Sequence, residues 1–107
     1  FSIALLSASD VTNTASGYLE DYVSDSFDNY GQHYSNAYDI LLRAAENSDS
    51  VEARDAYLAD AERLLLESGY VMPLWFGNSV YQLDKKLTGI CNDGTGRYIF
   101  TSVTKKN

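Results

Sequence analysis

The sequence predicts one domain of the α/β class, of the α+β type, in which a pair of helices packs on a mixed sheet. Two observations lead to this fold class. Apolar residues recur at helical spacing between residues 36 and 68, and segments rich in β-forming residues lie before and after that region. Strand, helices and strands in this order are typical of a helical layer on one sheet. The 107 residues, 45% of them hydrophobic, suit a single domain.

The N-terminal part is expected to hold a strand and a short helix. Residues 1–8 form an apolar run that ends in small polar residues, which is typical of a buried strand. In residues 15–23, apolar side chains recur at the spacing of a short amphipathic helix. Acidic residues, serines, an asparagine and a glycine come next, so this stretch is expected to form a loop.

The central part is expected to form two antiparallel helices joined by a short connection. The first begins at Ser35 or Asn36, either of which can accept a hydrogen bond from a free backbone N–H group. The second begins with a capping box of Asp49 and Glu52 and ends at Gly69. The residues expected to face the core are Tyr38, Leu41, Leu42 and Ala45, then Ala53, Tyr57, Ala61, Leu64 and Leu65.

The C-terminal part is expected to be β structure. Two strands are predicted near residues 70–76 and 79–84. Trp75 and Phe76 are expected to pack in the core, and the alternative is that they line a ligand pocket. Turn-forming residues at 92–94 precede a last strand, which is predicted near residues 97–103.

Charge excludes one class of partner. The net charge is −7, and residues 1–83 carry 3 basic and 13 acidic side chains, while residues 84–107 carry 5 basic and 2 acidic ones. An acidic protein repels phosphate backbones, so nucleic acid is not expected as a partner. The single cysteine, Cys91, allows no internal disulfide, and the longest apolar run is too short to span a membrane. Because the chain begins with Phe1, we expect it to be a piece of a longer protein.

No catalytic or metal-binding motif is visible. His33, the only histidine, is expected to be a surface or loop residue rather than a proton carrier. With one histidine, one cysteine and no CxxC or HExxH motif, a zinc site is not expected, and Asp21, Asp25 and Asp28 do not have the spacing of a calcium loop. The sequence therefore predicts neither an enzyme nor a cofactor or metal.

Several stretches, in the same order, resemble the C-terminal part of the family 5 extracellular solute-binding proteins. The central stretch runs from Tyr34 to Ile90 and includes both expected helices and the segment "YVMPLWFGNSVYQLDKKLTG". Upstream, "FSIALLSASD" and "YVSDSFDNYGQHYSN" are similar to a strand and a loop of that family, and "GRYIFTSV" is similar to its closing strand. The resemblance covers essentially the whole chain.

This resemblance implies a fold, a function and a location. The family folds into two lobes that close on a ligand, and this chain would be most of the C-terminal lobe of a type II periplasmic-binding-protein-like fold. Residues from about 90 to 107 would normally cross back to the other lobe. The implied function is the capture of oligopeptides or dipeptides for an ABC importer, with its permease subunits as partners. The whole protein would be periplasmic or a lipid-anchored lipoprotein outside the cell membrane.

The resemblance also implies a ligand-facing turn after the first strand. Its residues are Ser7, Ala8, Ser9, Asp10 and Val11. Peptide-binding members carry an aromatic residue and then an acid here, and the acid receives the peptide's α-amino group. By ungapped spacing Ala8 and Val11 occupy those two places, and Asp10 precedes the acidic one. Asp10 is therefore either the ligand's anchor after a one-residue shift or an ordinary loop acid.

Two other functions remain open. The same fold could bind a solute that is not a peptide, such as a nickel chelate or a sugar. Alternatively, the acidic helical face could contact a partner protein.

Overall fold

The computed structural model describes residues 3–8, 12–77, 80–94 and 96–106. The chain divides into two compact units, a helical unit (Phe1–Pro73) and a ribbon unit (Leu74–Asn107), and each is described by itself. The structure is 35% helical and 8% strand, with small antiparallel sheets. This mixture is compatible with the predicted α+β class.

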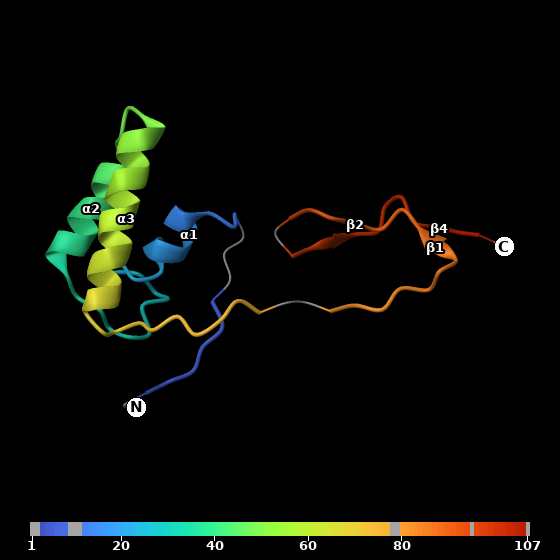
Figure 1. Cartoon of the computed structure of the whole chain (residues 1–107), viewed down its shortest axis with the longest axis horizontal. Coiled ribbons are helices and arrows are strands. Elements are labelled where there is room, and N and C mark those ends of the chain that lie inside the picture. The colour runs from blue at the N-terminus through green and yellow to red at the C-terminus, as the bar shows by residue number, and fades with distance from the viewer. Residues whose placement is uncertain (1–2, 9–11, 78–79, 95, 107) are drawn as a thin grey trace. The chain divides into compact units, whose positions relative to one another are not determined.

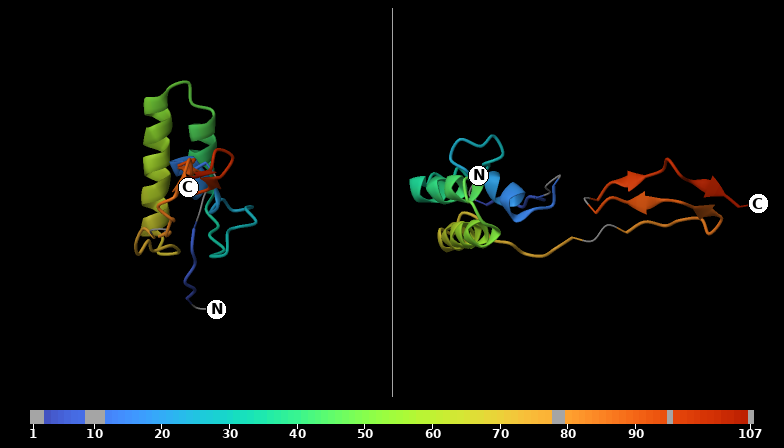
Figure 2. Two further views of the ribbon diagram at one scale, coloured as in Figure 1. Left: turned by 90° about the vertical axis from the view of Figure 1, so that its right-hand side faces the viewer. Right: turned by 90° about the horizontal axis from the view of Figure 1, so that it is seen from above.

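The helical unit contains an antiparallel helix pair, as predicted. Helix α2 spans Asn36–Glu46 and helix α3 spans Val51–Glu67, and the two lie side by side (Figures 1 and 2). The short helix α1 spans Ala15–Glu20 and packs against both. It ends three residues earlier than predicted, because Tyr22 and Val23 donate to carbonyl groups only three residues back, as in turns.

The core of the helical unit is made where the three helices meet. Tyr38 and Ala61 are fully buried, and the other core members are almost as inaccessible. One prediction is wrong: α3 turns Leu58 and not Tyr57 toward the core, and Tyr57 is 39% exposed. Both residues have helical spacing to Ala61, so only the position of α2 selects between them. The whole cluster is Leu19, Tyr38, Leu42, Ala45, Leu58, Ala61 and Leu65.

The helix ends show which side chains act as caps. The Ser35 hydroxyl accepts a hydrogen bond from the Tyr38 N–H group, so Ser35 and not Asn36 caps α2. The capping box at Asp49 was predicted wrongly, since the Ser50 hydroxyl accepts from Ala53 N at 3.2 Å. Gly69 follows α3 with a φ of 73°, as predicted for a left-handed residue at a helix end.

Several predicted strands are not formed. Residues 3–8 and 71–77 have no regular secondary structure, and neither do residues 80–84. Trp75 is 71% exposed and Phe76 fully exposed, so their predicted core positions are wrong. A strand needs a partner for its backbone hydrogen bonds, and an apolar sequence does not supply that partner.

In residues 80–94 and 96–106, the ribbon unit forms two short antiparallel strand pairs rather than one mixed sheet. Strand β1 (Leu87–Thr88) pairs with β4 (Thr104–Lys105), and β2 (Cys91–Asn92) pairs with β3 (Tyr98–Ile99), as Figure 1 shows. The predicted turn at residues 92–94 is confirmed, because the Asn92 side chain accepts from Gly94 N at 2.7 Å. The last predicted strand is interrupted by a turn at residues 101–102.

Truncation of Leu65 should destabilise the helical unit. Leu65 is 3% exposed and its neighbour Leu66 is 42% exposed, so the two leucines form a matched pair. We expect Leu65→Ala to lower the free energy of unfolding by about 2–5 kcal/mol through lost burial and a residual cavity. Leu66→Ala should cost about 1 kcal/mol or less. Urea unfolding followed by circular dichroism measures both, and equal losses would contradict this core.

The cap of α3 can be tested in the same way. We expect Ser50→Ala to lower the free energy of unfolding by about 1 kcal/mol, because the Ala53 N–H group loses its partner. The control is Asp49→Ala, which changes the residue before the cap and should have a smaller effect. A larger loss for Asp49→Ala would restore the capping box that the sequence predicts.

Candidate functional site

The ligand-facing turn predicted from the sequence is only partly described. Ser7 and Ala8 are exposed and belong to no helix or strand. Ser9, Asp10 and Val11 lie outside the described residues. The role assigned to this turn, and to Asp10 within it, stays a prediction.

The best-defined polar geometry lies in the loop between α1 and α2. The Asn29 side chain is almost buried and makes three hydrogen bonds. Its amide nitrogen donates to the carbonyl oxygen of His33 at 2.8 Å and to that of Val23 at 3.3 Å. Its amide oxygen accepts from the His33 backbone N–H group at 2.9 Å. The Asn29 side chain thus links the two ends of the loop, at Val23 and His33, by hydrogen bonds.

A carboxylate contact joins this loop to α2. Asp39 lies in the first turn of α2 and is 8% exposed. Its Oδ1 accepts a hydrogen bond from Ser24 N at 3.1 Å, and the Ser24 hydroxyl accepts from Ser35 N at 3.2 Å. A negative charge at this position is also favoured by the positive end of the helix dipole.

His33 is buried, which corrects the prediction of a surface histidine. It is in a loop, as predicted, but only 2% of it is exposed. Its Nδ1 lies 3.3 Å from the carbonyl oxygen of Tyr22, and its ring meets those of Tyr38 and Tyr70 edge to face at 5.1 and 5.4 Å. Aromatic contacts of this kind stabilise a buried imidazole without any partner charge.

Tyr38 is fully buried, and its hydroxyl group has a hydrogen-bond partner. It donates to the carbonyl oxygen of Leu19 at 2.6 Å. Burial raises the pKa of Tyr38 well above its ordinary value, and the nearby Tyr22, Asp39 and Asp21 raise it further. Tyr38 is therefore a neutral hydrogen-bond donor at physiological pH. We call Ser24, Asn29, His33, Tyr38 and Asp39 the loop network.

The loop network has the chemistry of a structural element. Within the described part of the chain, no buried side-chain nitrogen or oxygen lacks a hydrogen-bond partner. All five side chains of the network thus already interact with the protein. The same residues contain no group of three or more histidine, cysteine or acidic side chains that could hold a metal ion. The hydrogen bonds of the network therefore hold backbone segments of the loop and of α2 in place.

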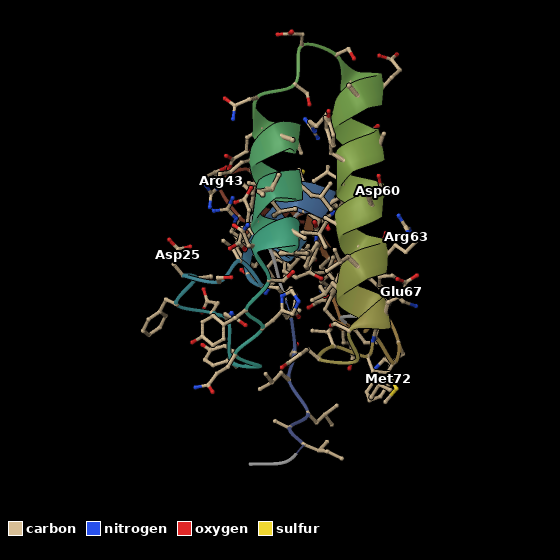
Figure 3. All side chains as sticks on the ribbon, turned by 90° about the vertical axis from the view of Figure 1, so that its left-hand side faces the viewer. Asp25, Arg43, Asp60, Arg63, Glu67 and Met72 are labelled. Carbon is tan, nitrogen blue, oxygen red and sulfur yellow. The ribbon has the colours of Figure 1, made fainter. Side chains whose placement is uncertain are left out.

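The surface of the helical unit also has a shallow depression with a volume of about 270 Å³. It lies where α1, α2 and α3 meet, and charges of both signs surround it, with Glu20 and Glu46 near Arg54. The outer surface of the helix pair is likewise charged, as Figure 3 shows for Arg43, Asp60 and Arg63. The depression is lined by Ser16, Glu20, Leu42, Ala45, Glu46, Ser48, Arg54 and Leu58.

Asn29 and Asp39 are polar residues whose roles the sequence pattern did not reveal. Asp39 stands beside Tyr38 on the buried side of an amphipathic helix, where a solvated acid is not expected. The position of Asp39 next to a core residue was therefore the sequence feature that could have indicated its structural role. Asn29 gave a weaker indication, because asparagine is common in any loop.

Comparison with known proteins adds no family assignment. No protein-family model matches the sequence, and no curated protein matches it. Among the described residues, no helix is long and apolar enough to cross a membrane.

Ionisation of Tyr38 should make the protein sensitive to alkali. Its pKa is raised in the folded state, so its stabilising effect is complete below the unfolded value near 10 and is lost as the pH rises beyond it. We expect the free energy of unfolding to fall between about pH 10 and pH 12, and Tyr38→Phe to reduce that fall. At neutral pH the same variant should lose about 1 kcal/mol with its hydrogen bond.

Tyr34→Phe is the control, because Tyr34 is 72% exposed. It should leave both the neutral stability and the alkaline fall unchanged. Urea unfolding at neutral and alkaline pH measures the difference. An alkaline fall that is identical in all three proteins would show that Tyr38 does not cause it.

Proposed function

We propose that this chain is part of the C-terminal lobe of a substrate-binding protein of an ABC importer, and that the whole protein captures peptides outside the cell membrane. The proposal rests on the resemblance of its ordered stretches to the family 5 solute-binding proteins. In this proposal the chain supplies one wall of a cleft, and the missing lobe supplies the other. Permease subunits of the importer are the expected protein partners.

One structural observation is consistent with the proposal. The stretches that resemble the family are held together by their own polar residues. Ser24 and Asn29 belong to the loop stretch, and Asp39 belongs to the helical stretch that follows. The hydrogen bond from Ser24 N to the Asp39 carboxylate joins the two. This contact packs the loop stretch against the helical stretch, as a fold that contains both stretches requires.

The exposed apolar chain gives further support. Ile3 is 92% exposed and Leu5 is 73% exposed, and Met72 and Trp75 are exposed to a similar degree. Proteins rarely leave such continuous apolar stretches in water unless another surface covers them. A lobe that normally packs within a larger two-lobed protein would have these surfaces.

The proposed ligand contact is the turn of residues 7–11. A carboxylate in a cleft that excludes water can hold a peptide's α-amino group through a charge-assisted hydrogen bond. Asp10 is the acid available for that role. Backbone groups and water would provide most of the remaining recognition, so the ligand's side chains would be read weakly.

Calorimetry on the complete receptor tests the proposal. We expect a mixture of tri- and tetrapeptides to bind, and Asp10→Ala to weaken the affinity by about tenfold or more. Asp25→Ala is the matched control, because it removes the same charge from an exposed loop acid. The isolated 107-residue chain should bind the same peptides more weakly than micromolar, since half of the cleft is absent.

The outcomes separate the alternatives. Binding of a sugar or a nickel chelate, with no peptide binding, would replace the ligand class and keep the fold. No binding of any small solute would overturn the transport proposal and favour a protein-interaction domain. Peptide binding that Asp10→Ala leaves unchanged would make Asp10 an ordinary loop acid.

A further inference from the structure

All four lysines of the sequence gather at the paired strands β1 and β4. Lys85 and Lys86 directly precede β1, while Lys105 ends β4 and Lys106 follows it. Leu87 pairs with Lys105, and the Lys106 N–H group donates to the Lys86 carbonyl oxygen at 2.8 Å. The antiparallel pairing therefore continues beyond the strand ends, and Lys86 and Lys106 stand opposite each other.

In residues 80–94 and 96–106, as in the rest of the described chain, the side chains of these lysines take part in no ion pair. Three arginines do: Arg54, Arg63 and Arg97 each lie within 4.0 Å of a carboxylate. The nearby carboxylate of Asp84 instead accepts the backbone N–H group of Lys86 at 2.9 Å. All four lysines are exposed.

Two hydroxyl groups lie beside the opposed lysines. Thr88 pairs directly with Thr104, and Lys106 lies two residues beyond Thr104, so these three residues share one face of the strand pair. Lys86 belongs to the turn that precedes β1, and its carbonyl oxygen accepts the Lys106 N–H group beside that face. The two threonine hydroxyl oxygens are 3.0 Å apart. Like charges directly across a strand pair destabilise it. An anion between the two lysines would remove that repulsion and could also accept from the hydroxyl groups.

The backbone keeps this face in place. Gly89, which follows β1, has a φ of 88°, and a Cβ atom there would collide with the carbonyl oxygen of Ser102. Only glycine permits this close approach of the two chain segments. The segments that carry the lysines are thus brought together by a feature of the fold.

We propose that this face is a binding site for phosphate groups, with Lys86 and Lys106 as the charged donors and the hydrogen-bonded hydroxyl pair of Thr88 and Thr104 as a neutral donor. A phosphate offers more acceptor oxygens and more negative charge than a carboxylate, so it can bridge both lysines. Lys85 and Lys105 add positive charge nearby. The phosphate group comes either from a free phosphate or from the headgroup of an anionic lipid.

Two titrations of the full chain test the site and distinguish these sources. Inorganic phosphate is titrated while the amide and lysine resonances are followed by nuclear magnetic resonance. Vesicles of phosphatidylglycerol are compared with vesicles of phosphatidylcholine in a sedimentation assay. Binding should weaken as sodium chloride is added, because the lysines are exposed to screening.

Variants of consecutive lysines compare the two faces of the β1–β4 strand pair. We expect Lys86→Gln and Lys106→Gln each to weaken binding by about fivefold. Lys105→Gln is the matched control, since it removes the same charge from the opposite face and should weaken binding less. Arg43→Gln is a second control, because it changes the net charge equally in the helical unit.

Each outcome is informative. Binding of inorganic phosphate alone assigns the site to free phosphate, and preferential binding of phosphatidylglycerol vesicles assigns it to a lipid headgroup. Absence of binding in both titrations overturns the proposal. Equal losses for Lys105→Gln and Lys106→Gln also overturn it, because the charge would then act without the shared face. Circular dichroism checks that every variant keeps the native fold.

Discussion

The buried hydrogen bond from the Tyr38 hydroxyl to the Leu19 carbonyl joins α2 to α1 and organises the rest of the helical unit. Tyr38 is also at the centre of the apolar core, so one side chain fills the space between helices and satisfies a backbone acceptor. The His33 ring packs against its edge, and that contact brings the loop before α2 into the same cluster. A small domain with few core residues depends strongly on such shared contacts.

Features set by local sequence could be predicted, whereas features set by contacts between distant segments could not. The spans of α2 and α3 follow from apolar spacing and end signals, which act within a few residues. The choice of Leu58 over Tyr57 and of Ser50 over Asp49 depends on the partner helix and on local φ and ψ values. Burial of His33 depends on Tyr70, which is far from it in sequence, so no local pattern could reveal it.

The predicted strands that are not formed also show that local sequence does not determine pairing between distant segments. Residues 3–8 and 71–77 have the composition of strands, but a strand exists only where another backbone pairs with it. The predicted ligand turn at residues 7–11 has the same dependence, because a binding role requires a surface on the other side of the ligand. For Ser7 and Ala8 the structure describes exposed chain, and sequence resemblance supplies the only argument for their function.

The uncharged run from Tyr70 to Leu83 has a consequence for solubility. It contains no acidic or basic side chain, and Trp75 and Phe76 within it are open to water. Such runs assemble readily into intermolecular β-sheets when chains meet during synthesis. Glu67 lies shortly before the run, Asp84 and two lysines follow it, and Pro73 interrupts it. Charges and a proline in these positions oppose sheet growth, so the residues that bracket this segment protect the protein from aggregation.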